Sequence, residues 1–371
     1  MKILHVGNFA DNRVNGIRNV LPFHVTEQAN YADVLFQNIA NVRIAECEAY
    51  QVPLELDGWP ANLKKKGEPF RPDLVVFHGF YHIETVLMYR RLRRCGIPYV
   101  IAPHGSLRPD AQRVKRLKKI FANLLLFDAY VRHARALQCL SQAEYDGAPR
   151  NKERFLATNG IYLPPKRKQY ASADRIRLVY IGRMETHIKG LDLLLEAVGE
   201  TADFLRENRC ELALYGPDQN GQHAALRQMI AERAVGDLVT LHDGVFGEEK
   251  ERILLSADVF VQTSRFEGMP MGVLEALSYG LPCLLTKGTT LSETAARYGA
   301  GWSCENTAPS IAAGLRRAVE DRASYPERSG RAIALIEENF QWDAVAASAV
   351  AQYAALCVPQ KRDDLISQEP K

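Results

Sequence analysis

The sequence predicts an α/β protein built from two Rossmann-like domains that face each other across a cleft. Two observations lead to this prediction. Short apolar runs alternate with helical patterns along almost the whole chain, which is typical of parallel sheets covered by helices on both faces. A Pro-rich, basic stretch at residues 160–169 interrupts the alternation near the middle and is typical of a linker. The length of 371 residues is sufficient for two or three domains.

The expected strands are short apolar runs that end at turn residues. In the first half they span residues 3–6, 34–37, 74–77, 99–102, 136–139 and 154–157. In the second half they span residues 177–181, 211–215, 239–241, 259–262 and 282–286. Helices are expected at 83–95, 110–127, 191–198, 223–234, 248–256, 273–279 and 310–320, and a long helical pattern runs from about residue 330 to about 356. The expected parts are a first domain at 1–163, a linker at 164–173, a second domain at 174–340, a C-terminal helix at 341–359 and a polar tail at 360–371.

The composition is that of an ordinary globular enzyme, with 47% apolar and 25% charged residues. A net charge of +3 is too small to indicate a nucleic-acid partner. The seven cysteines are scattered and form no Cys-x-x-Cys, which argues against a disulfide framework and a zinc site. Residues 1–7 are a short strand running into a glycine rather than a signal peptide, and no apolar run reaches about 18 residues. These features predict a cytoplasmic protein.

The most informative stretch is residues 264–276, which follows the apolar run 258–263. Two glycines flank a proline and a helix follows, so free amides and the helix dipole predict an anion site. Glu267 lies in this loop and Glu275 lies about one turn into the helix. Carboxylates repel phosphate but accept hydrogen bonds from hydroxyls, so the pair suits a nucleotide sugar. The alternative is that both are ordinary surface glutamates.

Arg183 and Lys189 follow the strand at 177–181 and precede the helix that begins near residue 191. A guanidinium fork and an ammonium group together suit a diphosphate, although each alone is more often paired with a surface acid. Glycine loops follow other strands, at Gly216-Pro217 and at Gly244-Val245, and each is suited to cradle a nucleobase or to form a plain turn.

Two features of the first half are candidates for contacts near the reacting sugar. His104 follows the strand at 99–102 directly and stands beside a glycine, where a substrate can reach it. The alternative is a histidine satisfied by backbone groups. Gly16 follows the first strand closely and precedes a helix start, which suits a close approach to a ligand. His78 also follows a strand, and His5 is expected in the core.

Residues 108–119 form an amphipathic basic helix in this prediction, with six cations and one acid. One interpretation is a core-packed helix with a solvated face. The other is a membrane or acceptor face that meets anionic lipid or a diphosphate-carrying lipid. The residues of that face are Arg113, Lys115, Arg116, Lys118 and Lys119.

With these motifs, nearly the whole chain resembles the retaining GT-B glycosyltransferases of family 4, also called glycosyl transferases group 1, of the bacterial surface-polysaccharide type. The pair Glu267 and Glu275 is similar to the family's Glu-x7-Glu motif, and Arg183-x5-Lys189 is similar to its phosphate pair. His104 looks like the family's active-site histidine. Residues 141–144 and 158–160 look like its interdomain segments. Met269 stands where the family usually has an aromatic residue after Glu-Gly.

The resemblance implies roles for these residues. It makes His104, Arg183, Lys189 and Glu267 catalytic, with Glu267 at the donor sugar and the two cations at the leaving diphosphate. It places Glu275 at the ribose hydroxyls and the acceptor on the first domain, to which the C-terminal helix crosses back. The donor-binding residues that it implies are Gly16, Gly216, Pro217, Val245, Gly268, Met269, Pro270, Met271, Gly272, Val273 and Glu275.

The implied reaction moves a hexosyl or N-acetylhexosaminyl group from a UDP- or GDP-linked sugar to a glycan or to a polyprenyl- or other lipid-linked acceptor, with retention of configuration. The expected setting is cell-surface polysaccharide or lipopolysaccharide biosynthesis, with peripheral contact to the cytoplasmic face of an anionic inner membrane and with no nucleic acid. No Asp-x-Asp motif is evident, so we expect no cofactor and no metal. The alternatives are a nucleotide-sugar epimerase and a non-catalytic nucleotide-sugar-binding protein.

Overall fold

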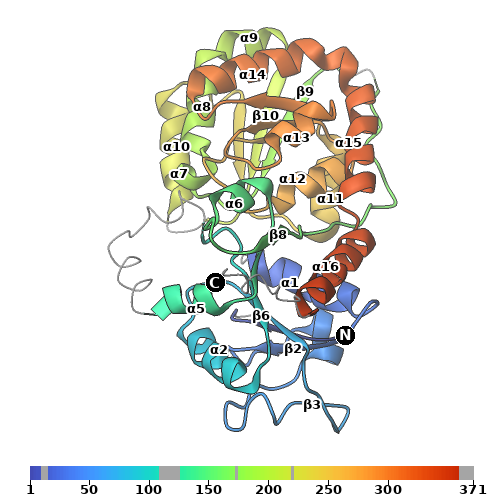
Figure 1. Cartoon of the computed structure of the whole chain (residues 1–371). Coiled ribbons are helices and arrows are strands. Elements are labelled where there is room, and N and C mark those ends of the chain that lie inside the picture. Colours follow the sequence, from blue (N-terminus) through green and yellow to red (C-terminus); the bar gives the residue numbers. More distant parts are fainter. Residues whose placement is uncertain (10–15, 108–125, 172–173, 219–220, 359–371) are drawn as a thin grey trace, which may run out of the picture.

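The computed structural model describes residues 1–9, 16–107, 126–171, 174–218 and 221–358, and these form two α/β domains stacked one above the other (Figure 1). Each domain is organised around a six-stranded parallel sheet. The first sheet has the order β2-β1-β5-β6-β7-β8 and the second has the order β11-β10-β9-β12-β13-β14. The predicted fold class is therefore confirmed.

The strands of the first sheet are β1 (Lys2–Gly7), β2 (Asp33–Asn38), β5 (Leu74–His78), β6 (Tyr99–Ala102), β7 (Ala136–Cys139) and β8 (Arg154–Leu156). Those of the second are β9 (Ile176–Ile181), β10 (Cys210–Tyr215), β11 (Val239–His242), β12 (Val259–Gln262), β13 (Cys283–Thr286) and β14 (Gly301–Cys304). A hairpin, β3 (Lys64–Lys65) and β4 (Glu68–Pro69), was not predicted from the sequence. Strand β14 was not predicted either, because Gly301, Trp302, Ser303 and Cys304 do not form an apolar run.

Helices cover both faces of the two sheets. The first domain contains α1 (Gly16–Gln28), the short helix η1 (Ala45–Tyr50), α2 (Ile83–Cys95), α5 (Asp128–His133) and α6 (Gln142–Gly147). The second contains α7 (Thr186–Lys189), α8 (Leu191–Glu200), α9 (Ala202–Glu207), α10 (Gln222–Glu232), α11 (Gly247–Ser256), α12 (Met271–Ser278), α13 (Ser292–Arg297), α14 (Ala308–Glu320), η3 (Asp321–Ser324) and α15 (Tyr325–Asn339). Most of the helix predicted at 110–127 lies outside the described residues.

Both faces of each sheet are buried, because alternate residues of one strand enter different cores. In β9, Leu178 and Tyr180 belong to one core cluster, and Val179 and Ile181 belong to the cluster on the opposite face. Strand β1 is arranged in the same way, with Leu4 and Val6 on one face and Ile3 on the other. Burial on both faces explains why these strands are continuous apolar runs in the sequence.

The single helical pattern predicted from about residue 330 to 356 was wrong, because the structure contains two helices there. Helix α15 ends at Asn339, and α16 (Trp342–Cys357) begins three residues later. The break has a tertiary cause: the carbonyl of Phe340 accepts a 2.7 Å hydrogen bond from the amide of Ile161, in the segment that leaves the first domain. Helix α16 then packs beside α1 (Figure 1), and its Ala349 and Tyr353 enter the core of the first domain.

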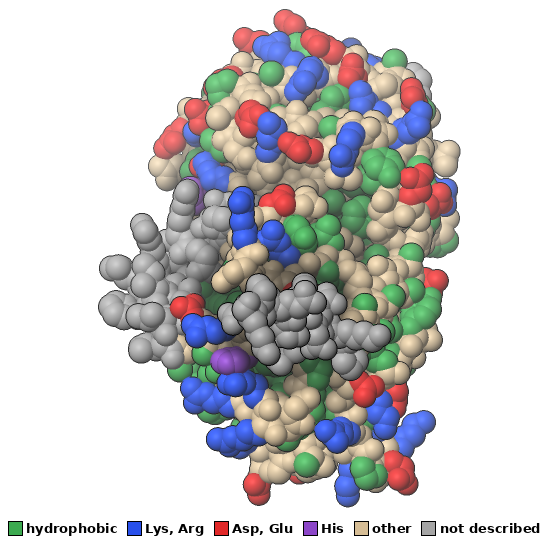
Figure 2. Space-filling model, viewed as in Figure 1, with side chains coloured by type: hydrophobic (Ala, Val, Ile, Leu, Met, Phe, Trp, Pro, Cys, Tyr) green, Lys and Arg blue, Asp and Glu red, His purple; other side chains and the backbone are tan. Residues whose placement is uncertain are grey.

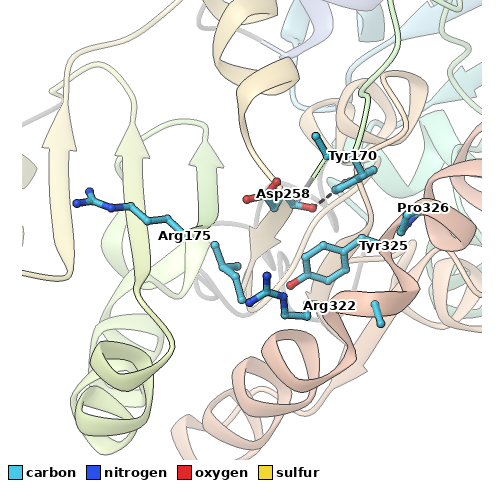
Figure 3. Close-up of a pocket in the computed structure, with 9 residues that line it drawn as sticks. Tyr170, Arg175, Asp258, Arg322, Tyr325 and Pro326 are labelled. Carbon is cyan, nitrogen blue, oxygen red and sulfur yellow. Dashed lines mark hydrogen bonds between the residues drawn. The ribbon is translucent and has the colours of Figure 1, made fainter. Parts of the chain in front are cut away.

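The linker is attached to the second domain at the amino ends of the strands, where a hollow of about 270 Å³ lies beside Tyr170, Asp258 and Tyr325 (Figure 3). The Tyr170 hydroxyl donates to the Asp258 carbonyl at 2.8 Å, and Lys168 Nζ lies 3.1 Å from Asp258 Oδ1. Both partners of that ion pair are largely buried, with 7% and 13% of their side chains exposed. The hollow therefore belongs to the contact between the predicted linker and the amino-end edge of the second sheet.

Basic and acidic side chains are interspersed over the upper, C-terminal domain on the face shown in Figure 2, and hydrophobic side chains gather nearer its junction with the lower domain. None of the helices within the described ranges is long and apolar enough to cross a membrane.

Candidate active site

A cavity of about 500 Å³ lies at the carboxyl ends of β9, β10, β11 and β12 and is bounded on the other side by α1 of the first domain. The second sheet reverses its strand order between β9 and β12, and ligands of open parallel sheets bind at such a switch point. Most of the predicted site residues line this cavity. They are Gly16, Arg183, Lys189, Gly216, Pro217, Val245, Glu267, Met269, Pro270, Met271, Gly272 and Glu275.

Glu267 is held by several groups at once, although it lies in a loop. Its Oε1 atom accepts hydrogen bonds from Lys189 Nζ at 2.5 Å and from Gln262 Nε2 at 2.9 Å. The Ser264 hydroxyl donates to the same oxygen at 2.7 Å. The side chains of Lys189 and Glu267 are only 12% and 13% exposed, so this is a largely buried, charge-assisted contact. The sequence did not identify Gln262 as a site residue, because it is the last residue of a buried strand.

Arg183 lines the same cavity and is more exposed, with 43% of its side chain accessible to solvent. Its Nη1 atom contacts Glu185 Oε1 at 2.9 Å, and its carbonyl accepts from the Tyr180 hydroxyl at 2.8 Å. The second contact joins the turn after β9 to a side chain of that strand and so fixes the turn. Arg183 therefore combines a fixed backbone with a side chain that can reach a ligand.

Glu275 pairs with Lys250 of α11, a cation that the sequence did not identify. Lys250 itself lines the cavity. It was missed because it stands in a helix segment of mixed charge, next to Glu248, Glu249 and Glu251, where nothing marks one cation as different from its neighbours. Among the described residues, three cations therefore line the cavity, and the two carboxylates of the predicted motif each contact one of the two lysines.

Close backbone packing explains why glycine follows β10. A Cβ atom on Gly216 would lie 1.9 Å from the carbonyl oxygen of Gly182, so a side chain there would separate the two loops.

Beside these two loops the cavity wall is aromatic, because Tyr215 lines it and stacks on His242 with ring centroids 4.5 Å apart. Phe246 also lines this part and is 54% exposed, while Asn19 and Phe23 of α1 complete the wall from the first domain.

Two of the predicted donor-binding residues are not in the cavity lining. Val273 is fully buried in the core, and its amide donates to the Pro270 carbonyl at 3.0 Å. Helix α12 therefore begins two residues earlier than predicted, and Val273 lies behind the cavity wall. Gly268 instead faces the first domain, because a Cβ atom built on Gly105 would lie 3.3 Å from its Cα.

This approach of Gly105 to Gly268 places the neighbouring His104 where the two domains meet. His104 has a φ of 49°, and the amide of Gly105 donates to Glu144 Oε1 at 2.6 Å. The second oxygen of Glu144 accepts from the amide of Leu140 at 2.8 Å, so this buried carboxylate anchors the loop. Burial lowers the pKa of His104 to about 3, so its imidazole is neutral at neutral pH.

The predicted membrane or acceptor face, formed by Arg113, Lys115, Arg116, Lys118 and Lys119, lies outside the described residues. Across the described ranges, no group of three or more His, Cys, Asp or Glu side chains is positioned to hold a metal ion.

Two parallel-sheet domains, with a charged cavity at the carboxyl ends of the second sheet and a loop of the first domain against it, define a protein of the GT-B class. The family comparisons agree. The model for glycosyl transferases group 1 matches residues 164–334, and the model for the glycosyl transferase 4-like domain matches residues 37–154. The chain therefore belongs to the group 1 glycosyltransferases, and it is a glycosyltransferase.

Individual proteins are similar to this chain in sequence or in fold. The chain is 26% identical over 302 residues to the GDP-mannose:cellobiosyl-diphosphopolyprenol alpha-mannosyltransferase of Xanthomonas campestris, covering 78% of this chain and 76% of that protein. The sucrose-phosphate synthase of Thermosynechococcus elongatus has a similar structure, with a TM-score of 0.73, 17% identity and coverage of 96% and 98%. The Anabaena protein Alr3699/HepE in complex with UDP and glucose has a TM-score of 0.69, 16% identity and coverage of 96% and 99%.

Proposed function

We propose that this protein transfers a hexosyl or N-acetylhexosaminyl group, with retention of anomeric configuration, from a UDP- or GDP-linked sugar to a glycan or lipid-linked acceptor. The observation that carries the proposal is the meeting of Arg183, Lys189, Glu267 and Glu275 in one cavity at the carboxyl ends of the second sheet. Cations beside carboxylates suit a ligand that has phosphates beside hydroxyls.

The donor lies in this cavity with its diphosphate toward Arg183, Lys189 and the first amides of α12. Glu275 accepts hydrogen bonds from the ribose hydroxyls, and Glu267 accepts them from the sugar. The base lies toward the aromatic wall at Tyr215 and Phe246, where its flat face can pack. Two similar proteins support a nucleoside diphosphate as part of the ligand, because one is named for GDP-mannose and the structure of the other is a complex with UDP and glucose.

In the reaction, the bond between the anomeric carbon and the diphosphate oxygen breaks, and that oxygen leaves with the electron pair. The acceptor hydroxyl oxygen forms the new bond on the same face of the sugar, and its proton passes to the departing diphosphate. Negative charge therefore grows beside Arg183 and Lys189, which stabilise it more strongly in the transition state than in the bound donor. The two cations, already positioned in the cavity, perform this role without a metal ion in our proposal.

The acceptor approaches from the first domain, at the junction between the loop of His104 and Gly268. We place the reaction in cell-surface polysaccharide or lipopolysaccharide biosynthesis on the cytoplasmic face of the inner membrane. The similarity to a mannosyltransferase named for a diphosphopolyprenol-linked acceptor supports this setting.

Thermal unfolding in the presence of UDP-, GDP- and ADP-linked sugars tests the donor class, since a ligand at 100 times its Kd stabilises by about 2.7 kcal/mol. We expect a raised Tm with one of the first two nucleotides. The stabilising donor is then incubated with lipid-linked oligosaccharides, and the anomeric configuration of the product is read by NMR. An inverted product would refute retention, and an epimerised donor without any transfer product would identify an epimerase.

A further inference from the structure

We propose that a buried hydrogen-bonded relay holds His104 as one neutral tautomer, with the proton on Nε2 and the lone pair on Nδ1. The relay consists of positioning residues that do not line the donor cavity, and it ends on the donor domain. Its members, in order from His104, are His78, His5, Gln28, His24 and Asn159, and the last contact is with Met271.

The half of the relay next to the cleft is a row of imidazoles. His104 Nε2 lies 3.0 Å from His78 Nδ1, and His78 Nε2 lies 2.9 Å from His5 Nδ1. His5 is in β1 and His78 is the last residue of β5. These two strands are neighbours at the point where the first sheet reverses its strand order.

The other half passes through two amides. His5 Nε2 lies 3.1 Å from Gln28 Oε1, and Gln28 Nε2 lies 3.4 Å from His24 Nδ1. His24 and Gln28 are four residues apart on α1, so they stand on one face of the helix. His24 Nε2 then lies 2.9 Å from Asn159 Oδ1 in the interdomain segment, and Asn159 Nδ2 lies 3.6 Å from the sulfur of Met271.

Burial makes this chain of hydrogen bonds obligatory. The five relay residues are at most 3% exposed, and an unpaired polar group there would lose its hydration without compensation. Both ring nitrogens of His5, His24 and His78 are used within the relay. Burial also lowers the pKa of His5 to about 3 and that of His24 to about 4, and it lowers the pKa of His78 well below 6.5. The imidazoles are therefore neutral, and each has one donor and one acceptor.

The direction of every hydrogen bond follows from the last contact. A thioether sulfur can only accept, so Asn159 presents its NH2 group to Met271 and its carbonyl oxygen to His24. His24 therefore donates from Nε2 and accepts at Nδ1, from the NH2 group of Gln28. The carbonyl oxygen of Gln28 then faces His5.

The same reasoning continues to the cleft. His5 donates from Nε2 to Gln28 and accepts at Nδ1 from His78. His78 consequently accepts at Nδ1 from the Nε2–H of His104. A neutral His104 with its proton on Nε2 has its lone pair on Nδ1, so it can accept a hydrogen bond there but cannot donate one.

The consequence of this tautomer rests on the proposed function. In that function, His104 accepts a hydrogen bond from a hydroxyl of the transferred sugar or of the acceptor. Because Met271 lines the donor cavity, the direction of the relay is set from the domain that holds the donor. The tautomer itself does not depend on the reaction and can be measured without any substrate.

The test is NMR of the full-length protein with 15N-labelled histidine, in which the shifts of the two ring nitrogens distinguish the tautomers. The signals of His104 are identified by their loss in His104→Gln. We expect a neutral ring with a protonated Nε2 from pH 6 to 8. A protonated Nδ1, or a doubly protonated ring at pH 7, would overturn the proposal. This measurement is made on the native protein, so it does not depend on whether a relay variant folds.

The relay is tested separately with Gln28→Leu and His78→Leu, and with His133→Gln as a control at an exposed position. In both relay variants His104 should become a mixture of tautomers. The kcat of each relay variant should fall about tenfold, which corresponds to the loss of one hydrogen bond. The Kd of the nucleoside diphosphate should change less than about twofold. His78→Asn, whose amide oxygen replaces Nδ1 as acceptor, should recover part of the loss. An unchanged His104 tautomer in both leucine variants would refute the relay. If no donor binds, the proposed function fails while the NMR result still decides the relay.

Discussion

Lys189 Nζ lies 2.5 Å from Glu267 Oε1, so the cation expected at the phosphates and the carboxylate expected at the sugar are in direct contact. Lys250 pairs with Glu275 in the same cavity. The two charge types of the site therefore position each other. Groups held in place before the reaction need little reorganisation as charge develops, which is the condition for electrostatic catalysis.

The first prediction concerns the phosphate pair. Arg183→Ala and Lys189→Ala should each lower kcat about 10²-fold, because each removes a fixed positive charge from the departing diphosphate. Steady-state rates of nucleoside diphosphate release measure this effect. Lys287→Ala is the matched control, since Lys287 pairs with Glu305 on the surface and does not line the cavity. Rates within threefold of the native value in both site variants would refute the assignment.

The second prediction concerns metal ions. Because Arg183 and Lys189 stabilise the diphosphate in our proposal, activity should remain after dialysis against EDTA. The measurement is the initial rate before and after chelation, with and without added Mg²⁺ or Mn²⁺. Complete loss of activity that manganese restores would show that a metal ion takes part in the reaction.

The third prediction separates donor binding from chemistry. Glu275→Ala and Glu275→Gln should weaken nucleoside diphosphate binding, because both remove a carboxylate from the ribose. His104→Ala should leave that affinity nearly unchanged and lower kcat, since His104 belongs to the opposite domain. Calorimetric titration of the nucleotide into each variant decides the matter. If His104→Ala abolished binding and Glu275→Ala did not, the roles of the two domains would be reversed.

The fourth prediction concerns pH and stability. His5 and His24 have folded-state pKa values of about 3 and about 4, below their ordinary 6.5. The unfolded chain therefore binds more protons as the pH falls below 6.5, and the folded state loses stability toward pH 4. Each imidazole accounts for a loss of up to about 2 kcal/mol between pH 7 and pH 5.

Urea unfolding at pH 7 and pH 5 measures this loss. The difference in unfolding free energy between the two pH values should shrink in His24→Gln and stay the same in His133→Gln, which changes an exposed histidine. A difference that is equal in the native protein and in His24→Gln would show that His24 does not contribute to it.

The fifth prediction concerns the basic segment at 108–119. If Arg113, Lys115, Arg116, Lys118 and Lys119 form a membrane face, the protein should co-sediment with anionic liposomes at low salt, and binding should weaken as salt is added. Replacing these five residues by glutamine should abolish co-sedimentation. The control replaces exposed cations of the second domain, Arg175, Arg177, Lys287 and Arg331. Equal recovery with neutral and anionic vesicles would favour a solvated face.

The sequence by itself determined the two parallel sheets, and it predicted site residues that the fold brings to one cavity. Strand β12 spans Val259–Gln262, as predicted, because a strand buried on both faces is a continuous apolar run. The residues after such strands meet at one edge of the sheet, so Arg183, Gly216 and Glu267 could be expected together without coordinates.

The tertiary structure alone decided the partners of these residues. Lys250 pairs with Glu275, and Gln262 donates to the same oxygen of Glu267 that Lys189 contacts. No sequence pattern links these residues, and only folding brings them into contact. The relay behind His104 joins β1, α1, β5 and the interdomain segment, at separations from 4 to 135 residues. Apolar periodicity reports which face of an element is buried, whereas the choice among buried polar partners depends on distances and hydrogen-bond directions that exist only in the folded chain.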